Sequence, residues 1–380
     1  MASRLAFLAD WLDPSSGVLW RYQLFYYVDT GEVEMFDVKN RRHFLKRVKY
    51  EPLAPGQLYP GAVVTVFARQ LHIRECGDDA TRRAVETRAE RTLAMIKPEA
   101  LHDTGKILAA VGGSGLLVAN LRMAHLAPAE AAQLYSAHEG APFFGELVAY
   151  IISGPVVAME LVGPGAVAAW RGLLGPTDPA RARAEAPDSI RAAFGTDKTR
   201  NAAHGSDSPA AAARELAFFF GSGGGGGVAA CGACGPGSAV AVVKPHAVRA
   251  GLAGQLLDGI QAHFDVTGLR QVRLDAAAAA EFLEVYKGVL PPAEWSAAVE
   301  ELSSGPALAV EVAAPDGGAA AEPLRQLCGP PDPELGRALR PGSLRARFGA
   351  SRVRNALHCT DLGEDGELEA RFIFGSDWVA

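Results

Sequence analysis

The sequence predicts an α/β protein in which a small β-rich domain, residues 1–91, is followed by two copies of one domain, residues 92–220 and 239–380. Residues 221–238 are rich in glycine, a composition that is typical of a flexible linker. The segments on either side of this linker share residue types at equal spacings, which indicates a duplication. The first 91 residues have no such spacings. A chain of 380 residues is long enough for these three domains.

Alternation of apolar and polar side chains predicts antiparallel strands in the first domain, within residues 19–29, 33–38 and 62–73. Residues 39–49, which we call the basic strip, hold six of this domain's 14 Lys and Arg residues, whereas the rest of the chain carries a net negative charge. Two interpretations of the basic strip are open. It is either a docking surface for an acidic partner or a charged edge strand that discourages aggregation.

Both copies open in the same way. A buried-strand pattern ends in Lys-Pro at Lys97 and at Lys244, and a helical stretch follows. Tyr135 and Tyr286 come next, each ahead of a Ser-Gly-Pro that precedes a strand. Gly-Pro pairs break the apolar segment 147–170, so we expect a buried strand and a turn there and not a membrane span.

The remaining spacings are identical in the two copies. The first copy has Arg171, Arg191, Asn201, His204 and Glu215, and the second has Arg325, Arg345, Asn355, His358 and Glu369. The two arginines are 20 residues apart in both copies, Asn follows after 10, His after 3 and Glu after 11. Chance would not return four equal spacings through the same residue types, so the sequence predicts a duplicated domain.

Together these residues predict a phosphoryl-transfer site. Lys, Arg, Tyr and Asn supply the charge and the hydrogen bonds that bind a polyphosphate. A histidine attacks phosphorus when an acceptor fixes its other ring nitrogen, and Glu215 is the candidate acceptor for His204. Neither lysine follows a glycine-rich phosphate loop, which excludes a P-loop enzyme.

The string NAAHGSDS at 201–208 resembles the active-site signature of nucleoside diphosphate kinases, and SGP, LLGPTDP and SIRAAFG occur in the order of that family. The resemblance covers residues 92–220 strongly and 239–375 more weakly. It implies two ferredoxin-like domains and a ping-pong reaction, in which His204 takes the γ-phosphate of a nucleoside triphosphate and passes it to a nucleoside diphosphate. Mg²⁺, held by the phosphates of ATP or of another triphosphate, is the implied cofactor.

The same resemblance implies roles for other residues of the first copy. The phosphate-binding set comprises Lys97, Tyr135, Arg171, Thr177 and Arg191. Lys97 and Asn201 also reach the ribose hydroxyls. Phe143 stacks on the base, unless its ring serves only the core. We interpret Arg181 and Arg183 as solvated residues of a loop rich in Pro and Ala.

The second copy keeps candidate nucleotide-binding residues at Lys244, Tyr286, Arg325, Arg345, Asn355 and His358. It departs from the pattern at Pro331, which replaces Thr177, and at Cys359-Thr360, which replace Gly205-Ser206. Glu294 falls opposite the stacking phenylalanine, where a carboxylate would repel phosphates. We therefore expect an active first copy and a second copy that is weak or inactive.

The first domain resembles the DM-ten module, a pleckstrin-homology-like fold, through residues 7–27, 33–47 and 66–71. With two kinase copies behind it, the arrangement resembles the axonemal branch of the kinase family. This implies a location in the cytoplasm, the cytoskeleton and the axoneme of cilia or flagella, with tubulin of the doublet microtubule and other axonemal proteins as partners. Two functions stay open: a working kinase beside microtubules, or a structural axonemal protein whose kinase folds are packing modules.

Composition argues against several other classes of protein. A formal net charge of −6 does not fit a protein that coats nucleic acid. Neither a secretory signal nor a membrane segment is expected. Five scattered cysteines predict no disulfide framework, and a reducing compartment fits them best. Cys231 and Cys234 form a CxxC pair without a second pair, so we expect no metal site there.

Overall fold

The computed structural model describes residues 4–221, 228–232 and 234–375; residues 1–3, 222–227, 233 and 376–380 lie outside the described set. The chain divides into two compact units. The first comprises residues 1–90, 162–165 and 273–306, and the second comprises 91–161, 166–272 and 307–380. The second unit therefore holds most of both repeated copies.

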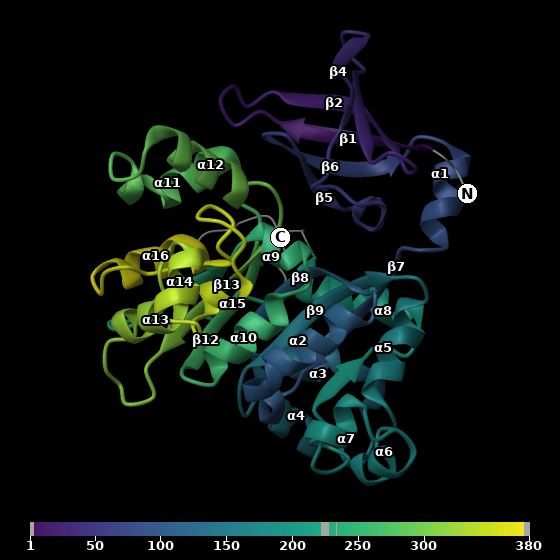
Figure 1. Cartoon of the computed structure of the whole chain (residues 1–380). Coiled ribbons are helices and arrows are strands. Elements are labelled where there is room, and N and C mark those ends of the chain that lie inside the picture. Colours follow the sequence, from purple (N-terminus) through teal and green to yellow (C-terminus); the bar gives the residue numbers. More distant parts are fainter. Residues whose placement is uncertain (1–3, 222–227, 233, 376–380) are drawn as a thin grey trace. The chain divides into compact units, whose positions relative to one another are not determined.

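The first unit is built on a six-stranded antiparallel sheet with the strand order β4-β3-β2-β1-β6-β5 (Figure 1). Buried and half-buried residues alternate along β3, as expected for a sheet that covers a core on one face. The predicted strands, and with them the β-rich character of the first domain, are confirmed. The elements of this unit are β1 (Arg4–Leu12), β2 (Leu19–Tyr27), β3 (Glu32–Asp37), β4 (Arg42–Lys49), η1 (Pro55–Gln57), β5 (Val63–Val66), β6 (Arg69–Cys76), α1 (Asp79–Glu86), α11 (Ala276–Phe282), η4 (Glu284–Tyr286) and α12 (Pro292–Leu302).

The first copy contributes the strand order β10-β7-β9-β8 to a second sheet, which is the 4-1-3-2 order of a ferredoxin-like domain. Every residue of β9 is buried, so this strand is the one expected within residues 147–170; residues 147–151 belong instead to helix α4. Its elements are β7 (Glu90–Ile96), η2 (Pro98–Asp103), α2 (Thr104–Gly113), β8 (Leu117–Ala124), α3 (Pro128–Leu134), η3 (Ser136–His138), α4 (Phe144–Ile151), β9 (Val156–Gly163), α5 (Ala166–Leu174), α6 (Pro179–Glu185), α7 (Ile190–Phe194), β10 (Ala203–Gly205) and α8 (Pro209–Phe220).

The second copy repeats this order as β12-β13-β11-β14, so the ferredoxin-like fold predicted for both copies is confirmed. Its helices α11 and α12 belong to the first unit. The remaining elements are β11 (Ala239–Val243), α9 (Pro245–Arg249), α10 (Ala253–Gln261), β12 (Asp265–Val272), β13 (Ala307–Ala313), α13 (Ala321–Cys328), α14 (Pro333–Leu339), α15 (Leu344–Phe348), β14 (Leu357–Cys359) and α16 (Asp365–Phe374).

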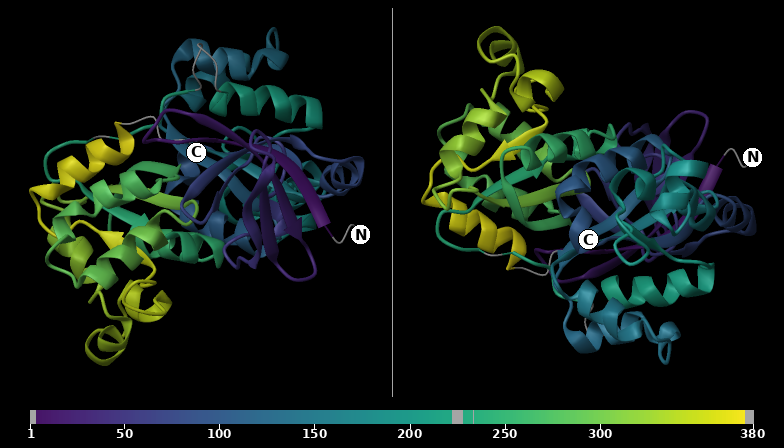
Figure 2. Two further views of the ribbon diagram at one scale, coloured as in Figure 1. Left: turned by 90° about the horizontal axis from the view of Figure 1, so that it is seen from above. Right: turned by 90° about the horizontal axis from the view of Figure 1, so that it is seen from below.

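The two copies pack as a pseudo-dimer within the second unit. Strands β8 and β12 pair through Arg122 and Arg270, which joins both halves into one eight-stranded sheet. Helices α2 and α10 lie side by side across this seam (Figures 1 and 2). The approach is close because glycine stands at the contact: a Cβ atom at Gly105 would lie 2.3 Å from the backbone nitrogen of Asp258. The Gly105 N–H also donates to Oε1 of Gln261 at 2.8 Å.

Part of the predicted linker packs against the first copy. Val228 is buried in that copy's core, and its carbonyl oxygen accepts a hydrogen bond from Arg122 Nη1 at 2.7 Å. The Cys231 N–H donates to the carbonyl of Met123 at 2.7 Å. Within the described part of the chain, no helix has the length and apolar character needed to cross a membrane.

Candidate active site

The short strand β10 positions His204. It pairs with β7, so that His204 lies opposite Met95, and Trp170 Nε1 donates to the His204 carbonyl at 3.1 Å. Ala202, two residues earlier, adopts a left-handed φ of 68°. This conformation costs a residue with a Cβ about 1–2 kcal/mol. It is held in place because the Ala202 N–H donates to Glu99 Oε1 at 2.8 Å.

The imidazole of His204 is oriented by Glu215. Nε2 lies 3.1 Å from Glu215 Oε1, and Ser206 Oγ donates to the other carboxylate oxygen at 2.6 Å. Burial raises the pKa of Glu215, but the His204 and Ser206 contacts outweigh burial and hold it below its usual value, so the carboxylate is ionised. Nδ1 of His204 has no hydrogen-bond partner among the described residues, and the side chain is 24% exposed. The geometry favours a proton on Nε2 and a lone pair on Nδ1.

Lys97 and Asn201 of the site are hydrogen-bonded to each other. Lys97 Nζ donates to the Thr199 carbonyl and to Asn201 Oδ1, both at 2.8 Å. Asn201 Nδ2 donates to the carbonyls of Thr177 and Lys198, both at 3.1 Å. Burial lowers the pKa of Lys97 to about 8. A buried ammonium group with a depressed pKa favours an anionic ligand, because that ligand restores its preference for the charged form.

Arg191 links the histidine strand to a pocket. Its Nη1 donates to the Gly175 carbonyl at 2.9 Å and its Nη2 to the Ala203 carbonyl at 3.1 Å. Burial and the nearby charge of Arg171 lower the pKa of Arg191 to about 10. The pocket, of about 440 Å³, is lined by Arg171, Gly175, Pro176, Thr177, Asp178, Arg181, Arg191 and Lys198. Four cations and one carboxylate thus surround it, and this net positive charge favours an anionic ligand.

Tyr135 and Phe143 have different surroundings. Tyr135 is buried, its ring lies edge-on to His204 with centroids 6.3 Å apart, and its hydroxyl has no hydrogen-bond partner among the described residues. Burial raises the pKa of Tyr135, so the hydroxyl stays protonated and able to donate. Phe143 is 51% exposed, whereas Phe144 packs against the core. Of the two rings, only Phe143 is therefore available to stack on a ligand.

The structure adds residues that sequence reasoning missed. Arg181 and Arg183 lie on helix α6, so the loop predicted for them was wrong, but both are exposed, as expected of solvated residues. Arg181 also lines the pocket. Lys198 and Asp178 line the same pocket, and no motif pointed to Lys198. Ser206 stands within the NAAHGSDS string, two residues after His204, so its contact with Glu215 was within reach of the sequence.

The second copy reproduces the first copy's hydrogen-bond pattern around its histidine. His358 Nε2 lies 2.9 Å from Glu369 Oε1, and Thr360 Oγ1 takes the place of the serine, at 2.6 Å from the other oxygen. The His358 side chain is only 7% exposed. Burial lowers its pKa, but the charge and hydrogen bond of Glu369 outweigh this, and the pKa is raised. Ala356 repeats the left-handed backbone, with a φ of 74°.

Four of the other five predicted residues of the second copy donate hydrogen bonds to backbone carbonyls. Lys244 Nζ donates to the Val353 carbonyl at 2.9 Å, and Asn355 Nδ2 donates to that of Pro331 at 3.0 Å. Arg345 is buried; it donates to two carbonyls and, through Nη2, to Cys359 Sγ at 3.5 Å. Arg325 is exposed and donates to the Asp361 carbonyl at 3.2 Å. Tyr286 lies in the first compact unit.

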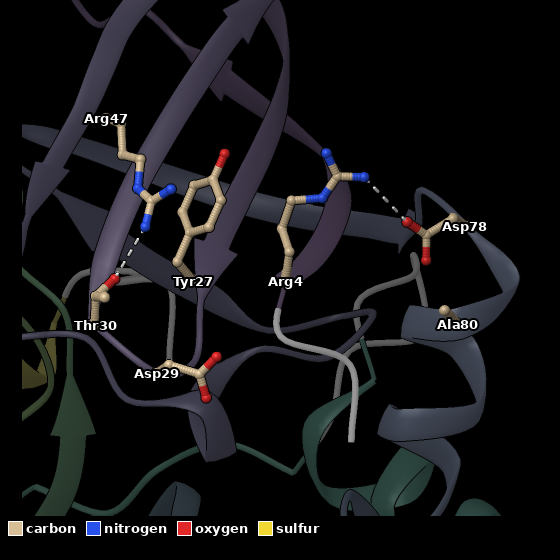
Figure 3. A pocket seen from close by; sticks show the side chains of 7 residues that line it. All are labelled: Arg4, Tyr27, Asp29, Thr30, Arg47, Asp78 and Ala80. Atoms are coloured by element: carbon tan, nitrogen blue, oxygen red, sulfur yellow. Dashed lines mark hydrogen bonds and ion pairs between the residues drawn. The ribbon is translucent and has the colours of Figure 1, made fainter.

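A further pocket, of about 640 Å³, lies in the first unit (Figure 3). Arg47 stacks over the Tyr27 ring at 3.7 Å and pairs with Glu32, and Arg4 faces Asp78 at 3.9 Å. Both guanidinium groups therefore face a carboxylate, whereas Arg171 and Arg191 of the first copy's pocket form no ion pair among the described residues.

Comparison with known proteins identifies the two copies. The model of the nucleoside diphosphate kinase family matches residues 90–223 and 238–379. Nucleoside diphosphate kinase homolog 7 of Rattus norvegicus and that of Mus musculus are each 45% identical to this chain, over 98% of its length and 93% of theirs. This similarity therefore extends beyond the copies into the first 90 residues.

Single-domain enzymes match a smaller part of the chain. The nucleoside diphosphate kinase of Deinococcus radiodurans is 48% identical over 34% of this chain and 94% of its own length. A crystal structure of the Aquifex aeolicus nucleoside diphosphate kinase is 46% identical, covers 35% of this chain and 95% of that one, and has a TM-score of 0.34.

Proposed function

This chain belongs to the nucleoside diphosphate kinase family, and from that premise we propose that its first copy is a working kinase that transfers the γ-phosphate of a nucleoside triphosphate to a nucleoside diphosphate. One observation carries the proposal: Glu215 holds Nε2 of His204, while Nδ1 has no hydrogen-bond partner among the described residues. An oriented nucleophile together with Arg171 and Arg191, which form no ion pair among the described residues, is the arrangement that phosphoryl transfer to a side chain requires.

The reaction divides into two half-reactions. In the first, the Nδ1 lone pair attacks the γ-phosphorus, the N–P bond forms, the bond to the β–γ bridging oxygen breaks, and a diphosphate leaves. In the second, a terminal oxygen of another diphosphate attacks the phosphorus and releases His204. Glu215 stabilises the Nε2 proton while positive charge develops on the ring. Arg171, Arg191 and Lys97 balance the charge on the transferred oxygens.

The residues of the site fit a magnesium ion that the nucleotide itself carries. Among the described residues, no three His, Cys, Asp or Glu side chains cluster as metal ligands, and Asp178 is the one carboxylate that lines the pocket. Mg²⁺ typically binds through substrate phosphates and few protein groups. When bound, it neutralises part of the charge of the β- and γ-phosphates. The chain's contribution is to hold those phosphates with Arg171, Thr177 and Arg191.

The second copy does not carry this activity. His358 is 7% exposed, against 24% for His204, so its ring nitrogen is poorly accessible to a nucleotide. Arg345 is committed to two carbonyls and to a thiol. Pro331 lacks the hydroxyl of Thr177. We assign this copy to packing against the first.

Labelling with radioactive ATP tests the proposal. In the presence of Mg²⁺ the full chain should form a phosphoenzyme that is labile in acid and stable in base, and GDP should discharge it to GTP. Initial rates should give the parallel double-reciprocal lines of a ping-pong reaction. A chain that binds ATP but takes up no label would contradict the kinase proposal. It would favour the alternative hypothesis of a structural axonemal protein whose kinase folds are packing modules.

A second candidate function, docking to an acidic partner, rests on the edge strand β4. All of its residues except Leu45 are exposed. Arg47 is engaged with Glu32, but Arg41, Arg42 and Lys46 have no ion pair among the described residues. Because tubulin is acidic, we propose that the basic strip binds the doublet microtubule of the axoneme, and that the protein belongs to the cytoplasm and cytoskeleton of ciliated or flagellated cells.

Charge reversal separates this function from catalysis. Substitution of Arg41, Arg42 and Lys46 by Glu should weaken microtubule association and incorporation into axonemes, while phosphate transfer stays near normal because distant sites are nearly independent. Association in solution should weaken with salt, as expected for exposed charges. Normal incorporation of the reversed variant would show that β4 is not the anchor.

A further inference from the structure

Lys198 lies in the loop between α7 and β10 and lines the pocket that also contains Arg171 and Arg191. The site itself fixes its backbone. The Lys198 carbonyl accepts from Asn201 Nδ2 at 3.1 Å, and the next carbonyl, of Thr199, accepts from Lys97 Nζ at 2.8 Å. The Lys198 side chain, in contrast, is 78% exposed. An anchored backbone with an exposed side chain leaves the ammonium group room to turn toward a ligand.

The ion pair that Lys198 forms with Asp178 is weak. Its Nζ lies 3.6 Å from Asp178 Oδ2, beyond hydrogen-bond length, and exposed pairs of this kind contribute little to stability. The neighbouring cation Arg181 is held more tightly, with Nε 2.7 Å from Glu185 Oε1. Asp178 faces the same pocket and would repel a phosphate if it were not neutralised. Lys198 is thus the cation of the pocket whose partner is most easily exchanged.

We propose that Lys198 determines specificity in the first site: on nucleotide binding it leaves Asp178 for a phosphate oxygen, and it thereby favours the more highly charged triphosphate over the diphosphate. This inference rests on the proposed nucleotide site. It adds a residue that is not among the identical residues shared by the two copies, and it assigns Asp178 the role of a counter-charge that the phosphate displaces.

Binding measurements on the full chain test the proposal, with ADP and a non-hydrolysable imido analogue of ATP as probes. Lys198→Gln should weaken binding of the triphosphate analogue about three- to fivefold and binding of ADP less than twofold, with a loss that shrinks as salt rises. Arg214→Gln is the matched control, because it removes one positive charge from an exposed position of α8 outside the pocket. It should change neither affinity.

Asp178→Asn sharpens the test. Asn also caps helices, so the hydrogen bond from the Ala180 N–H that begins α6 is retained. This variant should bind the triphosphate analogue about twofold more tightly, since it removes a repulsive carboxylate. Lys198→Arg should retain most of the preference, because it keeps the charge.

Each outcome decides a different claim. Equal weakening of both probes by Lys198→Gln, or a change no larger than that of Arg214→Gln, would overturn the specificity role. Wild-type protein that binds both probes with the expected preference but forms no phosphoenzyme would overturn the kinase function and leave the Lys198 inference standing. Wild-type protein that binds neither probe would overturn both.

Discussion

The two copies differ less in their hydrogen bonds than in their access to solvent. In both, the histidine lies on a three-residue strand, bonds to a glutamate eleven residues later, and follows an alanine with left-handed backbone. Yet His204 is 24% exposed and His358 7%. Preservation of a catalytic constellation therefore does not establish preservation of a catalytic site, because the same contacts also stabilise a closed fold.

The residues packed next to each histidine strand also differ. Gly205 is required in the first copy, since a Cβ there would lie 2.5 Å from Trp170 Cδ1. At the matching positions the second copy has Cys359 and Leu324. The smaller leucine leaves room for a side chain on the histidine strand. The sulfur of that side chain then contacts Arg345, whose counterpart Arg191 borders an open pocket.

The largest expected effect is on phosphate transfer, and it differs between substitution of His204 and substitution of His358. His204→Ala should abolish the phosphoenzyme and lower phosphate transfer roughly ten-thousand-fold or more, since no other group can take the phosphate. His358→Ala should leave transfer within twofold of the wild type. Label that persists in His204→Ala and maps to His358 would reverse our assignment of the two sites.

A smaller loss of activity is expected when Arg171 is substituted, and none when its counterpart Arg325 is substituted. Arg171→Gln removes a cation from the pocket and should lower kcat/KM about 10²- to 10³-fold, the usual cost of losing one preorganised group that stabilises transition-state charge. Arg325→Gln, its counterpart, should have no measurable effect on transfer. Equal losses in the two variants would mean that the second copy contributes to turnover.

The difference in packing between Gly205–Trp170 and Cys359–Leu324 can be tested by substitution. Gly205→Ala should destabilise the protein by about 1–3 kcal/mol, because the new methyl group collides with Trp170. In a Trp170→Leu background, which imitates the second copy, the same change should cost much less. Urea unfolding of the two single variants and the double variant measures the coupling energy. Simple additivity would show that the Trp170 contact does not dictate glycine.

The smallest effect is a pH dependence of nucleotide affinity. The Lys97 pKa is about 8 without ligand, and a bound anion favours the protonated form. Affinity for the triphosphate analogue should therefore fall about three- to tenfold as pH rises from 7 to 9, with proton uptake on binding near pH 8. Lys97→Arg should flatten this decline, because arginine keeps its charge throughout. A wild-type profile that is already flat would contradict the role of Lys97.

Sequence reasoning reached the duplication, the strand order implied by the family, and the histidine with its glutamate, because residue identity at fixed spacing encodes them. It did not reach Lys198, because exposed basic residues are common and the matching position of the second copy has Arg352 and not lysine. Nor did it reach the helix that brings Arg181 to the pocket. For Phe143 it left two alternatives open, stacking on the base or a role in the core only, and the exposure of the side chain in the structure is what distinguishes them. The burial of His358 was equally hidden, because the exposure of a side chain depends on the packed structure and not on residue identity alone.

The seam at β8 and β12 has a consequence for behaviour at low concentration. Separate subunits that pair through such an edge come apart on dilution, as mass action requires. Here both halves of the shared sheet lie on one polypeptide, and covalent connection keeps each half at a high effective concentration near the other. The pairing of one open site with one closed site should therefore persist at any concentration in the cell. Substitution of Gly105 at the α2–α10 contact would strain that pairing from within.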